Sequence, residues 1–234
     1  MGKKRIRGIG VVKILVTYPV VVCATIGTAL AWASPAVIGG SGTVSITPHD
    51  TYSSSVGVLG YKIDTNHVAY WPSSVDCNNI CVKVSHQGRS VNLLKIDSSG
   101  GAHDISYEAW NYLGFGKSAT EDPQTGGGIN MDYELVHASQ YKELLDDGKR
   151  PLSAANSMNY VASCLDKPDN WVAQNYALYS INEPTCRRGV DEKCHLNLAI
   201  SNQPECPSTL GAGKDLNIKV ENILYGSGKK VNAL

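Results

Sequence analysis

Residues 57–137 consist of short apolar runs separated by turns, and this pattern limits the possible folds more than any other feature of the sequence. In ICVKVS, valines alternate with polar residues, as expected for a strand with one buried face. The next four residues, HQGR, predict a hairpin loop before the run SVNLLKID. The runs VGVLGYKI, HVAYW and GGINMDYELV also predict strands. Because no βα unit repeats, the pattern favours a closed, mainly β barrel over a parallel sheet.

One short helix is expected within this region, over ISYEAWNYLG. Ser106 is a good N-cap, and Gly114 is suitably placed to end the helix. Two aspartates, Asp97 and Asp104, flank the Gly-Gly turn that comes before the helix. Three roles are open for these carboxylates: working groups of an enzyme, the polar rim of a binding groove, or residues that stabilise the turn and the helix end.

The first 33 residues have the order of a secretory signal peptide. A basic segment is followed by an apolar run and by Ala-Trp-Ala before a plausible cut at Ser34. An uncleaved membrane anchor is the alternative, because the apolar run approaches the length of a bilayer span. After cleavage, 16 basic and 21 acidic residues remain. This negative balance argues against nucleic acid and anionic membranes as partners. From the order of the leader itself we expect a secreted, extracellular protein.

Six cysteines remain after the signal peptide, and an even number in a secreted chain indicates three disulfides. Their pairing is open, and a local bridge between the fourth and fifth would close a charged loop, which we expect to be solvated. No CxxC pair occurs and the histidines are scattered, so we expect no metal and no other cofactor. The six are Cys77, Cys81, Cys164, Cys186, Cys194 and Cys206.

The segments on either side of the barrel region differ from it in composition. Residues 34–56 contain many Gly, Ser and Pro residues and predict a flexible lead-in. Residues 138–209 predict two helices, over ASQYKELLDDG from Ser139 and PLSAANSMNYVASCL capped by Ser153. The runs WVAQNYALYSI and HLNLAIS then predict strands. We expect an α+β extension packed on the barrel, or else a second small domain, followed by a tail over residues 210–234.

The order of motifs in residues 57–137 resembles the double-psi β-barrel of expansin N-terminal domains, barwin and rare lipoprotein A. Asp97 matches the strand-end aspartate of that superfamily, and Asp104-Ile105-Ser106 matches its Asp-Leu-Ser motif. Further matches are the aromatic pair Tyr70-Trp71, the helix aromatic Trp110, and the final strand from Gly128-Ile129 to Tyr133 and Val136. The whole chain is similar to a class of secreted fungal proteins that share this barrel.

The resemblance implies a six-stranded double-psi β-barrel with a short helix, plus a disulfide-containing α+β extension. The chain departs from the superfamily in three places. The turn after Asp97 contains no cysteine, and Cys77 and Cys81 are one residue further apart than usual. Nothing after residue 138 resembles the cellulose-binding domain of expansins, so wall loosening is not implied as strongly as the barrel.

The resemblance also implies a function: a non-catalytic barrel that binds a cell-wall polysaccharide through a groove of aspartates and aromatics. A secreted effector or inhibitor that binds an extracellular protein is the first alternative. The second is a glycan-cleaving enzyme, for which Asp97 and Asp104 are the catalytic candidates because such enzymes need two carboxylates. Each groove residue also has a purely structural alternative, and we expect a monomer. The groove residues are Tyr70, Trp71, Asp97, Asp104, Tyr107 and Trp110.

Overall fold

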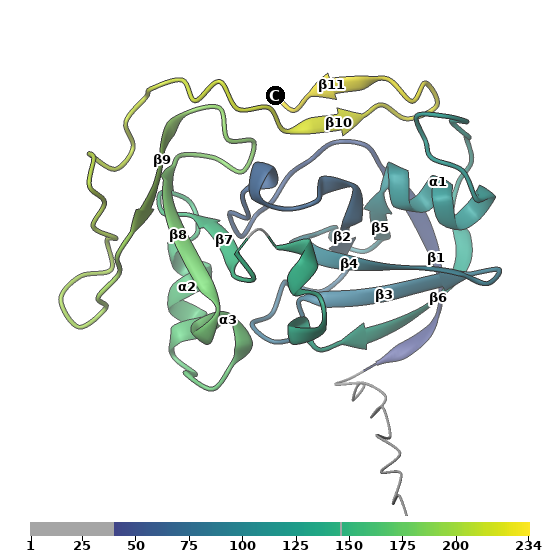
Figure 1. The fold of residues 1–234 in the computed structure, drawn as a ribbon. Coiled ribbons are helices and arrows are strands. Elements are labelled where there is room, and N and C mark those ends of the chain that lie inside the picture. Colours follow the sequence, from purple (N-terminus) through teal and green to yellow (C-terminus); the bar gives the residue numbers. More distant parts are fainter. Residues whose placement is uncertain (1–39, 146) are drawn as a thin grey trace, which may run out of the picture. The chain divides into compact units, whose positions relative to one another are not determined.

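A computed structural model describes residues 40–145 and 147–234 of the chain, so the expected signal peptide lies outside the described residues. Six strands form a closed barrel in the order β1-β5-β2-β4-β3-β6 (Figure 1). The β1–β5 and β2–β4 pairs are parallel, and the other four pairs are antiparallel. This confirms the expected closed, mainly β barrel. The strands are β1 (Ser41–His49), β2 (Val68–Trp71), β3 (Cys81–His86), β4 (Arg89–Ser98), β5 (His103–Ser106) and β6 (Ile129–Val136).

The first barrel strand lies inside the segment that we expected to be a flexible lead-in, and that expectation was wrong. In β1, Val44 and Ile46 alternate with hydroxyl side chains, and Ile46 is fully buried. This is the period of a strand with one face in the core. The abundance of Gly, Ser and Pro around it concealed the alternation. The barrel therefore begins at Ser41 and not at residue 57.

Two apolar clusters lie on opposite faces of the barrel strands. The inner cluster takes one or more buried side chains from every strand, including Ile46, Ala69, Val82, Leu93, Ile105 and Met131. The outer cluster takes Val68, Tyr70 and Leu94 from the opposite faces of the same strands, and joins them to Val161 and Leu178 further along the chain. Residues beyond the barrel are therefore packed on its outer surface.

The β3–β4 hairpin and the short helix follow the sequence closely. The hairpin turn is Gln87-Gly88, and both residues have positive φ angles, as a two-residue turn of this type requires. Helix α1 (Tyr107–Phe115) begins after Ser106, but the Ser106 hydroxyl donates to the carbonyl of Asn66 instead of capping the helix.

The end of α1 differs from the expectation. Gly114 lies inside the helix, and the left-handed C-cap is Gly116, with a φ of 76°. A Cβ atom on Gly114 would lie 2.8 Å from Cδ1 of Ile129 in β6, so this glycine allows close packing and does not end the helix.

The run VGVLGYKI does not form a strand as expected. It contains two isolated bridges, at Val58 and Ile63, and the 3-10 helix η1 (Gly60–Lys62) between them, and a second 3-10 helix, η2 (Thr65–His67), follows it. A β carbon on Gly60 would lie within 3 Å of the Val220 and Tyr52 side chains. The conformation of this run is therefore determined by packing against residues distant in the sequence. The local alternation of apolar and polar residues does not indicate such packing.

Beyond the barrel, a three-stranded sheet has the order β7-β8-β9, with β7–β8 parallel and β8–β9 antiparallel. The expected helix from Ser139 is replaced by two 3-10 helices, and the run HLNLAIS forms no strand. The second expected helix begins after Ser157 and not after Ser153, because residues 150–153 pair with β8. The elements are η3 (Ala138–Gln140), η4 (Lys142–Leu144), β7 (Arg150–Ser153), α2 (Met158–Leu165), α3 (Trp171–Gln174), β8 (Tyr176–Ile181) and β9 (Gly189–Cys194).

The expected tail also contains ordered structure. Strands β10 (Glu221–Ile223) and β11 (Lys230–Asn232) form an antiparallel hairpin, drawn in yellow in Figure 1. Val220 and Ala233 at its base are almost fully buried in the outer cluster. Residues 40–145 and 147–234 include no helix that is long and apolar enough to span a bilayer.

Two disulfides form where three were expected. Cys77 is bonded to Cys164 and Cys194 to Cys206, whereas Cys81 and Cys186 are free and buried. The proposed local bridge between Cys186 and Cys194 is therefore also absent. A buried free cysteine acts as a small apolar side chain, so an even cysteine count does not require complete pairing.

Candidate functional site

Tyr70 lies between the two aspartates singled out in the sequence. It is in register with Asp97 on β4 and with Asp104 on β5. Side chains in register point to the same face of a sheet. Tyr70 follows Ala69 of the inner cluster and belongs to the outer cluster, so this row lies on the outer face of the barrel.

Hydroxyl groups hold both carboxylates. Thr47 of β1, in register with Asp104, donates its hydroxyl hydrogen to the Asp104 carboxylate. Ser53 Oγ donates to Asp97 Oδ2 at 3.0 Å, and the backbone N–H of Ser98 donates to Asp97 Oδ1 at 2.8 Å. Both aspartates are half-buried. Their oxygens are thus positioned by neutral donors while retaining some contact with solvent.

Tyr70 itself is buried, with 4% of its surface exposed. Its hydroxyl donates to the carbonyl of Thr51 at 3.1 Å, and its ring lies 4.1 Å from the ring of His49, measured between centroids. Burial raises the pKa of the Tyr70 hydroxyl well above its ordinary value, and the charges of the two neighbouring aspartates act in the same direction. Tyr70 is therefore a neutral donor whose hydroxyl bonds the segment after β1 and neither of the two aspartates.

Trp71 points to the opposite face, toward the barrel interior. Its ring makes edge contacts with His103 at 4.7 Å and with Tyr133 at 5.4 Å between centroids. Trp71 is 5% exposed, whereas His103 and Tyr133 are half-buried. Partial burial lowers the pKa of His103, although the charge of Asp104 acts in the opposite direction. The structure does not bring Trp71 onto the face that carries the two aspartates.

Tyr107 and Trp110 of α1 are core residues, with 1% and 0% of their surfaces exposed. The Trp110 ring nitrogen donates to the carbonyl of Ile46 at 3.1 Å, and the Tyr107 hydroxyl donates to the carbonyl of Gln124 at 2.7 Å. In the conformation described, neither ring has a free face on which a sugar could stack.

An open cleft of about 450 Å³ lies beside Asp97. One wall comes from the segment between β1 and β2, and the other from the turn between β8 and β9. Tyr52, Pro184 and Leu234 contribute its apolar surface. The polar residues of the lining are Ser53, Ser54, Ser55, Asp97, Glu183, Thr185 and Arg187.

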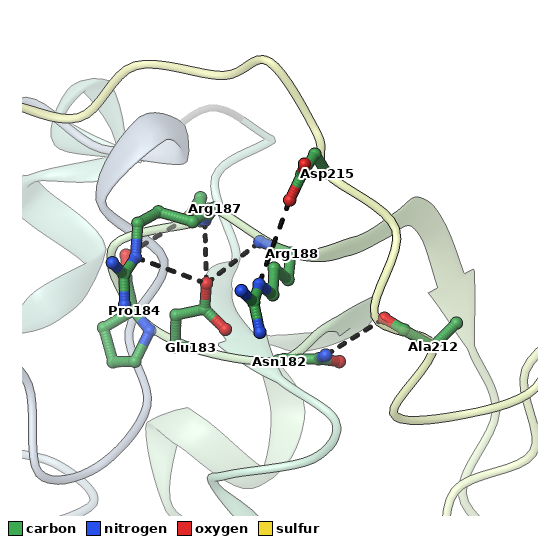
Figure 2. A network of polar contacts seen from close by, with 8 residues as sticks. Asn182, Glu183, Pro184, Arg187, Arg188, Ala212 and Asp215 are labelled. Atoms are coloured by element: carbon green, nitrogen blue, oxygen red, sulfur yellow. Dashed lines mark hydrogen bonds and ion pairs between the residues drawn. The ribbon is translucent and has the colours of Figure 1, made fainter. Parts of the chain in front are cut away.

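Glu183 fixes the turn that forms the second wall. Its Oε1 accepts hydrogen bonds from the backbone N–H groups of Arg187 at 3.0 Å and Arg188 at 2.9 Å, as Figure 2 shows. The Arg187 Nε atom lies 3.8 Å from the same oxygen. The Arg187 side chain is 57% exposed, and its guanidinium group can still reach a ligand.

The same turn is attached to a later segment of the chain. Asn182 Nδ2 donates to the carbonyl of Ala212 at 3.0 Å, and Arg188 Nε lies 3.8 Å from Asp215 Oδ1 (Figure 2). Gly60 N–H donates to the carbonyl of Pro184 at 2.9 Å from the other side. These contacts hold the wall in place, so the cleft is largely pre-formed.

The structure separates the two aspartates that sequence reasoning grouped together. Asp97 lines the cleft, whereas Asp104 does not. Sequence reasoning missed Glu183 and Arg187, and it placed the serines before β2 in a flexible segment. No local signal indicates that Glu183 lies near Asp97, because 85 residues separate them. Only the packing of the later residues on the barrel brings the two together.

The side chains that line the cleft can donate and accept hydrogen bonds. Within the described ranges, no group of three or more His, Cys, Asp or Glu side chains is placed to hold a metal ion. No family model, curated protein or solved structure matches the chain. The chemistry of this cleft and the motif order of the barrel are the features that bear on function.

Proposed function

We propose that the protein is a secreted, non-catalytic carbohydrate-binding barrel of the double-psi type, and that the cleft beside Asp97 receives part of a cell-wall polysaccharide. The supporting observation is the composition of the cleft. Two carboxylates, Asp97 and Glu183, share it with hydroxyl side chains and with the guanidinium group of Arg187. This mixture of neutral donors, acceptors and opposite charges suits a ligand rich in hydroxyl groups.

The strand pairing supports the double-psi assignment. β5 lies between β1 and β2, and β2 lies between β5 and β4. The two parallel pairs, β1–β5 and β2–β4, are therefore interlocked in the sheet. The two disulfides fit an oxidising compartment and hence a secreted protein.

The cleft has the size of a small-ligand site. Its volume of about 450 Å³ falls in the range of roughly 300–1,000 Å³ typical of such pockets. Sugar hydroxyls can donate to the carboxylates of Asp97 and Glu183 and can accept hydrogen bonds from Arg187 and from serine hydroxyls. Because the cleft is open, a chain longer than the cleft can continue beyond it.

The arrangement favours binding over cleavage. A glycosidase needs a carboxylic acid that donates a proton to the leaving oxygen. Glu183 accepts two backbone N–H bonds with a guanidinium group nearby, and Asp97 accepts bonds from Ser53 and Ser98. Both groups are thus held as hydrogen-bond acceptors. Asp104, the catalytic candidate by resemblance, is outside the cleft.

The test is binding of purified residues 34–234 to insoluble glucan, chitin and peptidoglycan in a sedimentation assay. Asp97→Asn and Arg187→Ala should each weaken binding to the preferred polymer about tenfold, the value of one charged hydrogen bond. Arg188→Ala is the matched control, because Arg188 is similarly exposed but faces Asp215 and does not line the cleft.

Equal losses in all three variants would contradict a role for the cleft. Binding to none of the polymers by a folded protein would reassign the function to an extracellular protein partner. Release of new reducing ends, abolished by Asp97→Asn or Asp104→Asn, would establish cleavage and overturn the non-catalytic proposal.

A further inference from the structure

The β10–β11 hairpin covers the aromatic residues that the sequence placed in the groove. We call residues 220–233 the strap. The ring of Tyr225, at the turn of the strap, lies 5.2 Å from the ring of Tyr107 and 6.5 Å from that of Trp110, measured between centroids. Its hydroxyl contacts Gly126 twice, accepting from the N–H at 2.5 Å and donating to the carbonyl at 2.7 Å.

Polar contacts attach the strap to the barrel at separate points. The Tyr225 N–H donates to Asp50 Oδ2 at 2.9 Å, and the Gly226 N–H donates to the Tyr107 hydroxyl at 3.3 Å. The Tyr52 N–H donates to Asn222 Oδ1 at 2.9 Å. Of these three contacts, the one to Asp50 is exposed and the other two are partly buried. Water can replace the exposed contact, and both bonds of the Tyr225 hydroxyl to Gly126, at low cost.

A narrow space lies between the strap and the barrel. Its volume of about 20 Å³ is enough for a single water molecule. Tyr70 and Tyr107 line it from the barrel, and Asn222 lines it from the strap. Tyr52 lines both this space and the open cleft, so the two are adjacent. Tyr52 is the one lining residue that they share, and the narrow space reaches from it to Tyr107.

Val220 and Ala233 at the base of the strap are buried in the outer cluster and Ile223 in the inner one, but the turn of the strap projects beyond these anchors. The two strands of the strap pair only with each other and form no ladder with the barrel. A two-stranded hairpin has little stability of its own. Residues 207–219, which precede it, contain no regular helix or strand. Backbone hydrogen bonds at Lys214 and Leu216 attach this segment to the β8–β9 turn, so residues 217–219 are the short hinge that remains before the strap.

We propose that the strap is a lid over the aromatic half of the ligand surface, and that a polysaccharide longer than the cleft must displace it to reach Tyr70 and Tyr107. This inference rests on the proposed function. The contacts that carry it are those of the Tyr225 ring with Tyr107 and Trp110, which the strap covers. The closed strap therefore competes with long ligands and leaves short ones unaffected.

The first test measures hydrogen exchange of the ligand-free protein. Strap amides such as Leu224 and Tyr225 should exchange at least about a hundredfold faster than barrel amides such as Val82, because the strap opens locally. Tyr225→Ala should increase exchange in the strap further without changing the barrel. Tyr112→Ala is the matched control, since Tyr112 is 40% exposed and Tyr225 39% exposed, but Tyr112 lies on α1 away from the strap. If the strap amides exchange their hydrogens only when the whole protein unfolds, the proposal that the strap is a lid is wrong.

The second test measures binding of cellohexaose and chitohexaose beside their disaccharides. If the strap is closed about nine-tenths of the time, Tyr225→Ala should tighten hexasaccharide binding about tenfold and leave disaccharide binding unchanged. If Tyr225→Ala binds the hexasaccharides as well as the wild-type protein or more weakly, the proposal that the strap is a lid is wrong. Failure of every saccharide to bind any form would refute the proposed function instead. Exchange of the ligand-free protein would still decide whether the strap opens, so the two failures are distinguishable.

Discussion

Asp97 and Asp104 lie on the two strands that flank β2, and both are in register with Tyr70. Their surroundings nevertheless differ. Asp97 lines an open cleft, whereas Asp104 is bonded to the hydroxyl of Thr47 on the adjacent parallel strand. Two aspartates at the ends of one turn thus have different roles: the first suits ligand binding, and the second connects β1 to β5.

The bond between Thr47 and Asp104 is expected to contribute to stability. Thr47→Val should lower the free energy of unfolding by about 1 kcal/mol, because it leaves a half-buried carboxylate without its hydroxyl donor. Thr43→Val is the control, since Thr43 makes the same type of bond to Asp132 at an exposed position of the same strand. Urea unfolding measures both. Equal effects of the two changes would contradict a special role for Asp104 in the barrel.

The two free thiols are expected to be inert in the folded protein. Cys81 and Cys186 are 1% and 0% exposed, and burial raises their pKa values to about 12 and about 11. A thiol reagent at pH 8 should therefore leave folded residues 34–234 unmodified. In denaturant without reductant, it should modify both cysteines. Modification of neither would show that a third disulfide exists.

The two disulfides are expected to differ in their contribution to stability. The Cys77–Cys164 bond spans 87 residues and joins the loop before β3 to α2, whereas Cys194–Cys206 spans only 12 residues. Replacing both partners with alanine should cost about 4.5 kcal/mol for the first bond and about 3 kcal/mol for the second, since longer loops restrict the unfolded chain more. Denaturant unfolding of the two double variants compares them directly. A larger loss from the shorter loop would contradict this explanation.

One histidine should make stability depend on pH. His67 Nδ1 lies 2.5 Å from Asp64 Oδ2. This hydrogen bond raises the pKa of His67 against the opposing effect of burial, and it lowers the pKa of Asp64. The His67 contribution is complete below its unfolded pKa of about 6.5 and is lost as pH rises through the raised folded value. The Asp64 contribution is present above its unfolded pKa of about 3.9 and is lost as pH falls.

The difference in unfolding free energy between the wild-type protein and His67→Gln should therefore shrink between pH 6 and pH 9. Comparing the two proteins cancels the opposite effect of His103, whose pKa is lowered by burial in both. Asp64→Asn should remove the same pH dependence. A difference that stays constant over this interval would show that the pair contributes no pH-linked stability.

Sequence patterns predicted the barrel best where neighbouring residues determine the structure. The β3–β4 hairpin followed from alternating valines and a Gln-Gly turn, and the start of α1 followed from Ser106. The β1 strand was missed although Val44 and Ile46 alternate correctly, because surrounding small residues suggested flexibility. The strap was missed because its strands are three residues long and depend on packing against distant aromatics.

The candidate site was predicted only in part, for a similar reason. Asp97 was identified from its place at a strand end, but the rest of the cleft depends on contacts between segments far apart in the chain. Arg187 was in a charged loop that was expected to be solvated, and Glu183, four residues before it, was not singled out because its role depends on the folded turn. The aromatics were identified as groove residues, whereas the strap places Tyr107 and Trp110 in the core.

The pairing of β1 also constrains the order in which the barrel can assemble. Its neighbours are β5 and β6, so its first hydrogen-bonded partner begins only at residue 103 and its second at residue 129. Contacts this distant in sequence slow folding, because a long loop must close before they form. During synthesis β1 therefore emerges long before its partners and stays unpaired until they follow.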